Sequence, residues 1–445
     1  MRLFRGEGQY GAALGRDWTE VSVNLAWDPT PHRGRQFASE EVAKEFAHRP
    51  CHNHNFRCKR PLMATLRERA KGRIVRAISS VRKSTLKPVV ANNEKFRGYL
   101  SANRYTLTLG AGISRGIAPD WQDLTQELMS LAFSQSIPKE TFDDLLKLGW
   151  SLDGLIQNAA NEFKRKGKTN TEVTEAIEQC LYANIRNKAR GLGLEKYLTA
   201  VLNRPKTIEK NKVIEVCEFL ENSFPDSSLF PICRYLVDSA KLGHAPLAVI
   251  SFNADTFLET YIDLHLRRNH YLGPPPHGHP PYYYSAVNGS GAGRGSKIPI
   301  YHCHGSIAPL ERAGGHPKDR RDRLVFLEEE YLALSSGRSA WAQSVFLFHA
   351  QSTRMAFCGL SMSDANIRRW MSAIEADVKD YHYVHGNSAR SNPEHIWIRP
   401  KPLDELSEEI LLSSLTHLGV RPAWIGGWEQ LYDALMNLSA TKTTS

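Results

Sequence analysis

The chain has 445 residues, 41% of them hydrophobic and 23% charged, which is enough apolar content for one large or two ordinary domains with a sizeable core. No run of about 18 apolar residues is present and the first residues lack the apolar core of a secretory signal, so we expect a cytoplasmic protein without a membrane span. Its seven scattered cysteines, an odd number, indicate reduced thiols rather than a disulfide framework.

The net charge of +10 is concentrated in one stretch near the N-terminus. Between residues 56 and 97, thirteen Lys and Arg stand against two Glu, a balance of +11, so the rest of the chain is close to neutral. We predict that residues 1–95 form a basic, partly disordered N-terminal extension. A solvated or partner-facing helix and a nucleic-acid contact are both compatible with this stretch. Its apolar residues at helical spacing are Leu66, Ile74, Ile78 and Val81.

Within the extension, CHNHNFRC contains the residue types that bind zinc. Cys51, His52, His54 and Cys58 are spaced irregularly, and no second Cys/His pair follows at zinc-finger distance. We therefore predict that this cluster is not a metal site.

An ordered pattern begins near Asn103, with a predicted strand at 105–109, a glycine turn, and a helix from about Pro119. Gly110 and Gly112 let backbone amides approach an anionic ligand, and Ser114 adds a hydroxyl donor. The positive end of the following helix would point at the same ligand. A tight strand-to-helix turn that binds nothing also needs glycine, so this motif alone does not decide between the two.

A mainly helical block, about 136–244, follows this first unit and is predicted to be an insertion. The buried run PLAVISF comes next and ends at Asn253 and Asp255. Asp255 either caps the next helix or lies with Asn253 at the strand end, where open α/β sheets bind ligands. The stretch 273–297, rich in Pro and Gly, is predicted to be a loop.

Further strands are predicted along the chain, and polar residues and glycines recur at their ends. IPIYHCHGS would place His302 and His304 on the same side, with His304 at the strand tip. A short strand is predicted at 324–327, and RMAFC leads to Gly359, Ser361 and Asp364. Strands at HIWIRP and GVRPAWIG, each followed by a helix, complete the chain. Alternating strands and helices predict an α/β fold with a doubly wound, Rossmann-like parallel sheet.

Four strand ends carry GAGIS, FNAD, HCHGS and GLSMSD in that order. In this respect the chain resembles the sirtuin-like, Sir2-type proteins of bacterial antiphage defence, over about residues 96–438. The resemblance implies a single sirtuin-type catalytic domain, 96–445, that carries the helical insertion.

The resemblance also implies roles for the residues of these motifs. Asn253 and Asp255 would flank the nicotinamide, and His304 would be the catalytic histidine near the ribose. The expected cofactor-binding residues are Gly110, Ala111, Gly112 and Ser114 at the NAD diphosphate, Gly359 and Ser361 at the adenosine half, and Asp364 in the Ser-x-x-Asp pattern.

Two features depart from the family pattern. SRGIAPDW is one residue shorter than the usual Ser-to-Trp stretch, which displaces Gly116. Deacylase sirtuins carry a zinc module with two Cys-x-x-Cys pairs, whereas only Cys303 and Cys358 lie between Asn253 and Gly359 here. No bound metal is therefore expected, and protein deacylation is disfavoured.

We therefore expect NAD to be the substrate, cleaved to nicotinamide and ADP-ribose in an antiphage response that depletes NAD. Nicotinamide is a good leaving group, so the site needs only to stabilise an oxocarbenium-like ribose and to position water. Asn253 is suited to orient water or hydroxyls, and His304 to accept a proton. ADP-ribosyl transfer, cyclisation and a non-catalytic nucleotide-sensing module are the alternatives. The family implies control by homo-oligomerisation, by a co-encoded partner such as an ATPase, or by a phage-derived trigger.

Overall fold

The computed structural model describes residues 88–102, 104–203, 208–273, 282–287, 297–309, 324–335, 340–384 and 394–441. All of them fall within one unit of the chain, Ser84–Ser445. The Cys51 to Cys58 cluster and most of the basic stretch, residues 56–87, lie outside the described residues. Within the described part of the chain, no helix is both long and apolar enough to cross a membrane.

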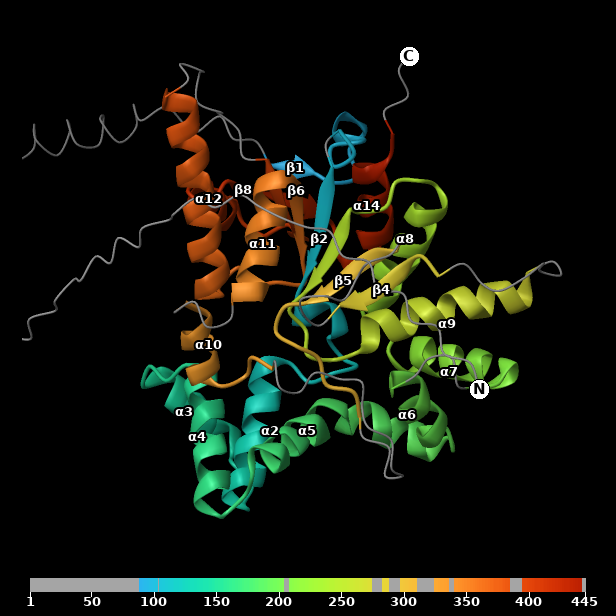
Figure 1. The fold of residues 1–445 in the computed structure, drawn as a ribbon, viewed down its shortest axis with the longest axis vertical. Helices are drawn as coiled ribbons and strands as arrows, with labels where there is room; N and C mark the ends of the chain where they lie inside the picture. Colours follow the sequence, from blue (N-terminus) through green and yellow to red (C-terminus); the bar gives the residue numbers. More distant parts are fainter. Residues whose placement is uncertain are drawn as a thin grey trace, which may run out of the picture. The chain divides into compact units, whose positions relative to one another are not determined.

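A single parallel sheet forms the centre of the described structure, in the order β1-β8-β7-β6-β2-β3-β5-β4 (Figure 1). Strands β2, β3 and β6 are buried along their whole length, as their continuous apolar runs predict. The strands are β1 (Val89–Val90), β2 (Tyr105–Leu109), β3 (Ala248–Ser251), β4 (Tyr284–Val287), β5 (Ile298–His302), β6 (Arg354–Cys358), β7 (His395–Pro400) and β8 (Val420–Ile425).

The direction of winding reverses at β2. From β2 the chain proceeds to β3 and β5 on one side, and it returns to place β6, β7 and β8 on the other side. In the ladders of β2, Thr106 pairs with Ala248 of β3 and with Met355 of β6. The predicted doubly wound α/β fold is thus confirmed, and its topological switch point lies between β2 and β6, where such sheets bind ligands.

Helices cover both faces of the sheet (Figure 1). Along β6 the residues alternate: Met355 and Phe357 pack with α11, α12 and α13, while Ala356 and Cys358 face the core on the opposite side. That opposite core includes α8, α9 and α14. These helices are α8 (Leu229–Lys241), α9 (Phe257–Leu272), α11 (Ala340–Ser352), α12 (Ala365–Val384), α13 (Glu405–Thr416) and α14 (Leu431–Ser439).

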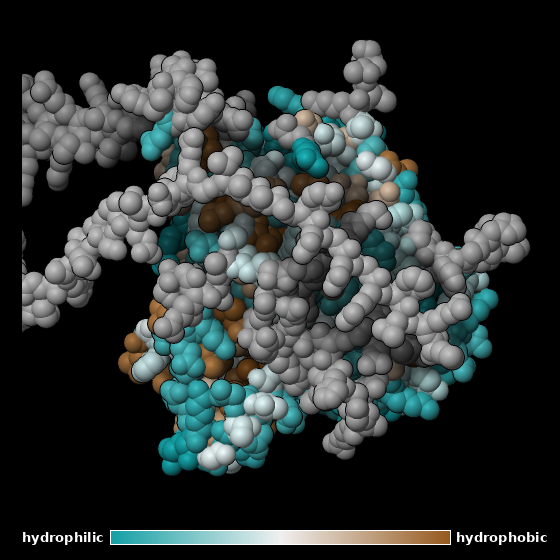
Figure 2. All heavy atoms as spheres, in the orientation of Figure 1, coloured by the Kyte–Doolittle hydropathy of each residue, from teal (hydrophilic) through white to brown (hydrophobic). Residues whose placement is uncertain are grey.

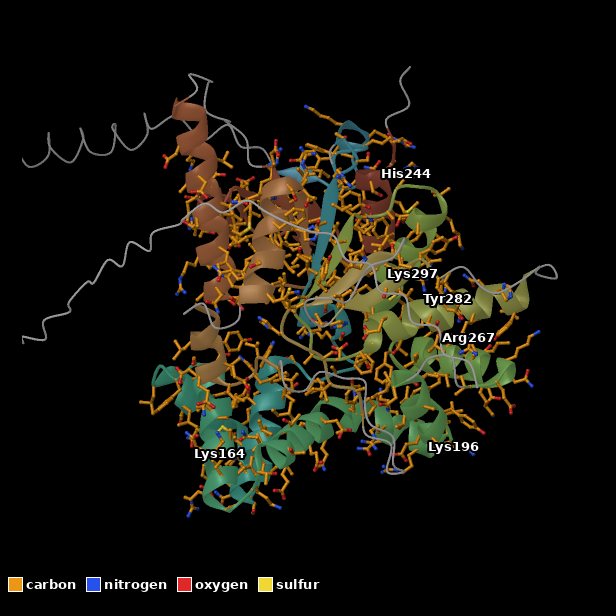
Figure 3. The ribbon with its side chains drawn as sticks, viewed as in Figure 1. Lys164, Lys196, His244, Arg267, Tyr282 and Lys297 are labelled. Carbon is orange, nitrogen blue, oxygen red and sulfur yellow. The ribbon has the colours of Figure 1, made fainter. Side chains whose placement is uncertain are left out.

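A block of helices follows β2 and gathers beyond the end of that strand (Figure 1). α2 packs on α4 and α5, and α4 also contacts α10 from much later in the chain. Lys164 on α4, labelled in Figure 3, pairs with Glu329 at the start of α10 at 3.7 Å. The remaining helices are α2 (Trp121–Phe133), α3 (Lys139–Lys147), α4 (Leu152–Arg165), α5 (Asn170–Gly191), α6 (Glu195–Asn203), α7 (Lys210–Ser223) and α10 (Glu328–Ser335), with short 3₁₀ turns η1 (Glu94–Phe96), η2 (Ala111–Ser114) and η5 (Trp428–Gln430).

Three predictions about these elements were wrong. Residues 324–327 are not a strand, because the amides of Phe326 and Leu327 donate to the Glu330 carboxylate at 2.7 and 2.8 Å instead of joining a ladder. The predicted loop 273–297 contains β4, which pairs with β5 at the sheet edge. The helix expected from Pro119 begins at Trp121, because the Asp120 side chain caps it there.

Candidate active site

The turn after β2 packs its glycines against the end of β6. Gly110 N donates to Cys358 O at 3.1 Å, and Gly112 N donates to Gly359 O at 2.9 Å. A Cβ on Gly112 would lie 2.8 Å from Gly359 O, and Gly359 itself has φ +68°. The chain's own packing therefore requires glycine at these positions, and the amides of Gly110 and Gly112 already have acceptors.

Ala111 begins the 3₁₀ turn η2 (Ala111–Ser114), so α2 does not follow the glycines directly. The Asp120 carboxylate accepts hydrogen bonds from the amides of Gln122 and Asp123 at 2.9 and 3.0 Å. The first-turn amides of α2, which the sequence suggested for a phosphate, are thus already engaged by a carboxylate of the chain.

The side-chain amide of Asn253, just after β3, has a hydrogen bond at its nitrogen and none at its oxygen among the described residues. Nδ2 donates to Ser114 Oγ at 3.3 Å, which links the β3 end to the glycine turn. The residue is 5% exposed, and its Oδ1 is buried without a hydrogen-bond donor among the described residues. A buried acceptor without a donor costs about 1–3 kcal/mol, so this oxygen is able to accept a hydrogen bond from a group beyond the described residues.

Asp255 lies two residues further on and is also buried, at 4% exposure. Its Oδ1 accepts a hydrogen bond from Phe257 N at 3.0 Å, at the start of α9. Burial, partly offset by this amide bond, raises the pKa of Asp255 to about 6. The carboxyl group thus bonds the first amide of α9, as the capping account expects, while its ligand-binding role stays a prediction.

The histidine that ends β5 and the one two residues later have different surroundings. β5 ends at His302, so strand alternation does not continue to His304. Burial alone would lower the pKa of His302, but the Glu259 carboxylate, 3.3 Å from His302 Nε2 and outside hydrogen-bond geometry, raises it above its usual value. Burial lowers the pKa of His304 to about 4. The pKa values of the two histidines are therefore shifted in opposite directions, and His304 is a neutral ring at pH 7.

His304 lies between aromatic rings at the end of the sheet. Its ring centroid is 4.8 Å from that of Phe252 and 5.3 Å from that of Tyr331 on α10. The segment that follows β5 is bonded to the segment that follows β3, because Ile307 N donates to Ala254 O at 2.7 Å. The segments that follow β3 and β5, which carry Asn253 and His304, are thus hydrogen-bonded to each other.

The loop after β6 supplies the remaining predicted residues. Ser361 is exposed, and its Oγ lies 2.5 Å from Ser363 Oγ. Asp364 caps α12 by accepting from Asn366 N at 2.8 Å. Its charge also acts on groups across the site: it opposes the pKa lowering at His304 and, after burial, adds to the raised pKa of Asp153 on α4.

Several residues that position this site were not found from the sequence. Tyr182 on α5 accepts from Thr256 N at 3.1 Å and donates to Ile307 O at 2.6 Å, so it ties the β3 and β5 ends together. Asn184, also on α5, donates to Gly116 O at 2.8 Å. From helical periodicity alone, Tyr182 cannot be distinguished from an ordinary aromatic residue of the core. Only its hydrogen bonds to residues distant in the sequence indicate its role.

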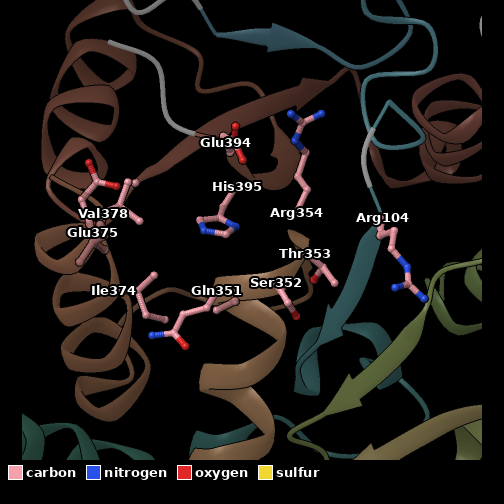
Figure 4. A pocket seen from close by; sticks show the side chains of 13 residues that line it. Arg104, Gln351, Ser352, Thr353, Arg354, Ile374, Glu375, Val378, Glu394 and His395 are labelled. Carbon is pink, nitrogen blue, oxygen red and sulfur yellow. The ribbon is translucent and has the colours of Figure 1, made fainter. Parts of the chain in front are cut away.

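A cavity of about 360 Å³ lies elsewhere, at the opposite end of the strands (Figure 4). It is lined by residues such as Arg104, Gln351, Glu375 and His395, which precede or begin β2, β6 and β7 or lie on helices beside them. None of the predicted site residues lines it. Among the described side chains, no three His, Cys, Asp or Glu are grouped as metal ligands would be.

The structure thus joins Ser114 to Asn253 directly, places Asp255 next to them, and couples His304 to Asp364 by charge. These residues belong to four strand ends on either side of the switch point.

Residues 247–417 match the family model of the SIR2-like domain. The SIR2-like match runs from β3 to the end of α13, so it includes Asn253, Asp255 and His304 and the loop after β6. The glycine turn after β2 and the helical block precede it. No curated protein matches the chain. A SIR2-like domain is compatible with use of NAD, and the parallel sheet agrees with it.

Proposed function

We propose that this chain is an NAD glycohydrolase, which cleaves NAD to nicotinamide and ADP-ribose. The buried, donorless Oδ1 of Asn253 carries the proposal, because it is an oriented acceptor at the switch point of an α/β sheet. The SIR2-like match over the same strand ends supports NAD as the ligand.

The reaction breaks the bond between ribose C1′ and the nicotinamide nitrogen, and the bonding electron pair leaves with nicotinamide. A water oxygen then bonds to C1′ and loses a proton. Asn253 Oδ1 accepts a hydrogen bond from that water or from a ribose hydroxyl, while Ser114 holds its amide in orientation. Because the bond to Ser114 already orients the Asn253 amide, this side chain does not need to move during the proposed reaction.

Asp255 is better suited than His304 to accept the proton. A general base is most effective when its pKa lies near the working pH. Burial raises the pKa of Asp255 to about 6, whereas it lowers that of His304 to about 4. We therefore assign the base to Asp255, and we assign His304 to packing and positioning of the ribose as a neutral ring.

Control of such an enzyme is needed because uncontrolled NAD loss kills the cell. Asn253, Asp255 and His304 are 4–5% exposed, which fits a site that opens only when activated. Apolar side chains are exposed over α3 and α10, where brown atoms gather in Figure 2. Leu148, Trp150 and Leu332 have 77%, 52% and 63% of their surface exposed. We propose this surface for a homo-oligomer or a co-encoded activating partner.

In the cell, we propose that the chain acts in the cytoplasm and limits phage growth by depleting NAD after a phage-derived trigger. The basic residues 56–97 remain our candidate for a nucleic-acid contact within that response.

The test is nicotinamide release from NAD by the purified full chain, with its neighbouring gene products or phage lysate added in parallel. Asn253→Ala is expected to lower the rate by about 100-fold or more. Asn437→Ala is the matched control, because Asn437 also donates through Nδ2, at 2.8 Å to Ala91 O beside β1. Equal rates for wild type and Asn253→Ala under every condition would refute the assignment. Cyclic ADP-ribose or ADP-ribosylated protein as the main product would instead indicate cyclisation or transfer.

A further inference from the structure

Arg399 is a half-buried cation without a counter-ion at the end of β7. Within the described part of the chain its guanidinium has no ion pair or hydrogen bond, and its Nε is buried without an acceptor. Its guanidinium lies over the ring of Trp397, 4.5 Å from the centroid. Burial lowers the pKa of Arg399, with no acidic group acting against this effect.

Other arginines of the described structure with little exposed surface have acceptors. Arg268 donates to both oxygens of Glu221 at 2.7 and 2.8 Å, and Arg186 pairs with Glu178 at 3.0 Å. Burying a cation without an anion is costly, so such pairing is the rule inside proteins. Arg354 and Arg421 share a buried Nε without an acceptor, but their terminal nitrogens donate to oxygens of Tyr99, whereas no such bond is made by the Arg399 guanidinium within the described residues.

Two acidic side chains at the helices after β6 and β7 are engaged elsewhere. Glu408 on α13 accepts from Trp424 Nε1 at 2.7 Å and pairs with Lys401 at 3.1 Å. Asp364 caps α12, and its charge acts on the groups near His304. Among the described residues, no carboxylate is paired with the Arg399 guanidinium.

The position of Arg399 relates it to the proposed nucleotide site. Trp397 Nε1 donates to Leu360 O at 2.8 Å, which fixes the loop holding Ser361 against β7. β7 lies two strands from β2, because β6 stands between them. At about 4.8 Å per strand, the end of β7 is about 10 Å from the glycine turn. A nucleotide that lies along this edge from the end of β2 past β6 would bring its adenosine ribose towards β7 and Arg399.

We propose that Arg399 binds a phosphate group on the adenosine ribose, so that the site accepts nucleotides with a 2′-phosphate, such as NADP, in preference to NAD. This rests on the proposed function only in taking the carboxyl edge of the sheet as the nucleotide site. The planar guanidinium suits bidentate contact with phosphate.

The experiment compares dissociation constants for adenosine 2′,5′-bisphosphate and 5′-AMP by titration calorimetry at fixed ionic strength on the full chain. Wild type is expected to bind the bisphosphate about 10–100-fold more tightly. Arg399→Met keeps the apolar stem on Trp397, and it should bring the ratio of the two constants close to one. Lys401→Ala, which removes a cation already paired with Glu408, should leave the ratio unchanged.

A ratio near one in wild type, or an unchanged ratio in a folded Arg399→Met protein, overturns the inference. Thermal unfolding establishes that the variant is folded, and Arg399→Lys provides a second variant that keeps the charge without the fork. The two proposals fail separately. Nicotinamide release without a bisphosphate preference leaves the glycohydrolase standing, whereas a preference that depends on Arg399 without any nicotinamide release leaves only the phosphate site.

Discussion

Ser114 and Asn253 are joined by a hydrogen bond of 3.3 Å that connects the turn after β2 with the end of β3. The bond determines which way the Asn253 amide faces, because an amide that donates to Ser114 directs its oxygen away from it. The donorless oxygen and the glycine turn are therefore parts of one arrangement.

We predict that Ser114→Ala lowers kcat for nicotinamide release by about 10–100-fold, because the Asn253 amide loses its fixed orientation. Ser227→Ala is the matched control. Ser227 is also buried and bonds the same turn, through Ile113 O at 3.2 Å, but it does not contact Asn253. Steady-state kinetics on both variants measure the difference, and equal losses in the two would show that the bond to Asn253 has no special role.

The pH profile should distinguish Asp255 from His304. If Asp255 must be ionised, kcat/KM falls as the pH drops through about 6, the raised pKa of that carboxyl group. A requirement for neutral His304 would put the limb at about 4 instead. Asp255→Asn should remove the limb near 6 along with most of the activity. A limb at 6 that persists in Asp255→Asn contradicts the assignment.

The same carboxyl group makes stability depend on pH. Its pKa rises from the usual 3.8 to about 6 on folding, so the folded state binds the proton more tightly. The stabilisation is fully present below pH 3.8 and is lost as the pH rises through about 6. At neutral pH Asp255→Asn should therefore stabilise the protein, by up to about 3 kcal/mol. Urea unfolding of both proteins at pH 5 and pH 8 tests this, and no gain at pH 8 would contradict it.

Tyr182→Phe should weaken the site from a distance. The change leaves Thr256 N and Ile307 O without their shared partner, at a cost of about 1–3 kcal/mol for each buried group. We expect lower stability in denaturant and faster amide exchange at residues 254–257. Tyr432→Phe provides the comparison, since its hydroxyl bonds Asp238 at 3.0 Å away from the site. Similar exchange in both variants would argue against a positioning role.

Two glycines with positive φ should respond very differently to alanine. At Gly359 a Cβ would lie 2.8 Å from Ile113 N and 3.0 Å from Gly110 O, which are backbone atoms that cannot move aside. At Gly116, with φ +85°, it would meet nothing within 4 Å. Gly116→Ala should cost about 1–2 kcal/mol from the left-handed conformation alone, and Gly359→Ala clearly more. Comparable midpoints in urea would show that the close approach is relaxed in solution.

The sheet could be predicted from the sequence where strands are continuous apolar runs, as at β2, β3 and β6. Residues 324–327 show why this signal fails for short segments. Leu324, Val325 and Phe326 are as buried as a strand, but the amide of Phe326 donates to a side-chain carboxylate instead of to a neighbouring strand. β4 was missed because its edge position leaves it partly exposed and its surroundings are rich in Pro and Gly.

The site could be predicted in part because strand ends of a parallel sheet meet at one edge. Asn253, Asp255 and His304 were found through this rule and through the resemblance. Tyr182, Glu259 and Arg399 were not, since their significance depends on long-range partners, or on the lack of one, that no local pattern contains. Packing against Gly359 is a further reason for glycine at positions 110 and 112, and it too depends on a partner distant in the sequence.

The order of the strands in the chain has a consequence for synthesis. Central strand β2 pairs with Ala248 and its neighbours on one side and with Met355 and its neighbours on the other, so both partners emerge from the ribosome long after it. The glycine turn cannot reach its final shape until Gly359 has been made. A nascent or prematurely terminated chain that ends before β6 therefore lacks a completed site, and under the proposed function such a partial product would not consume NAD.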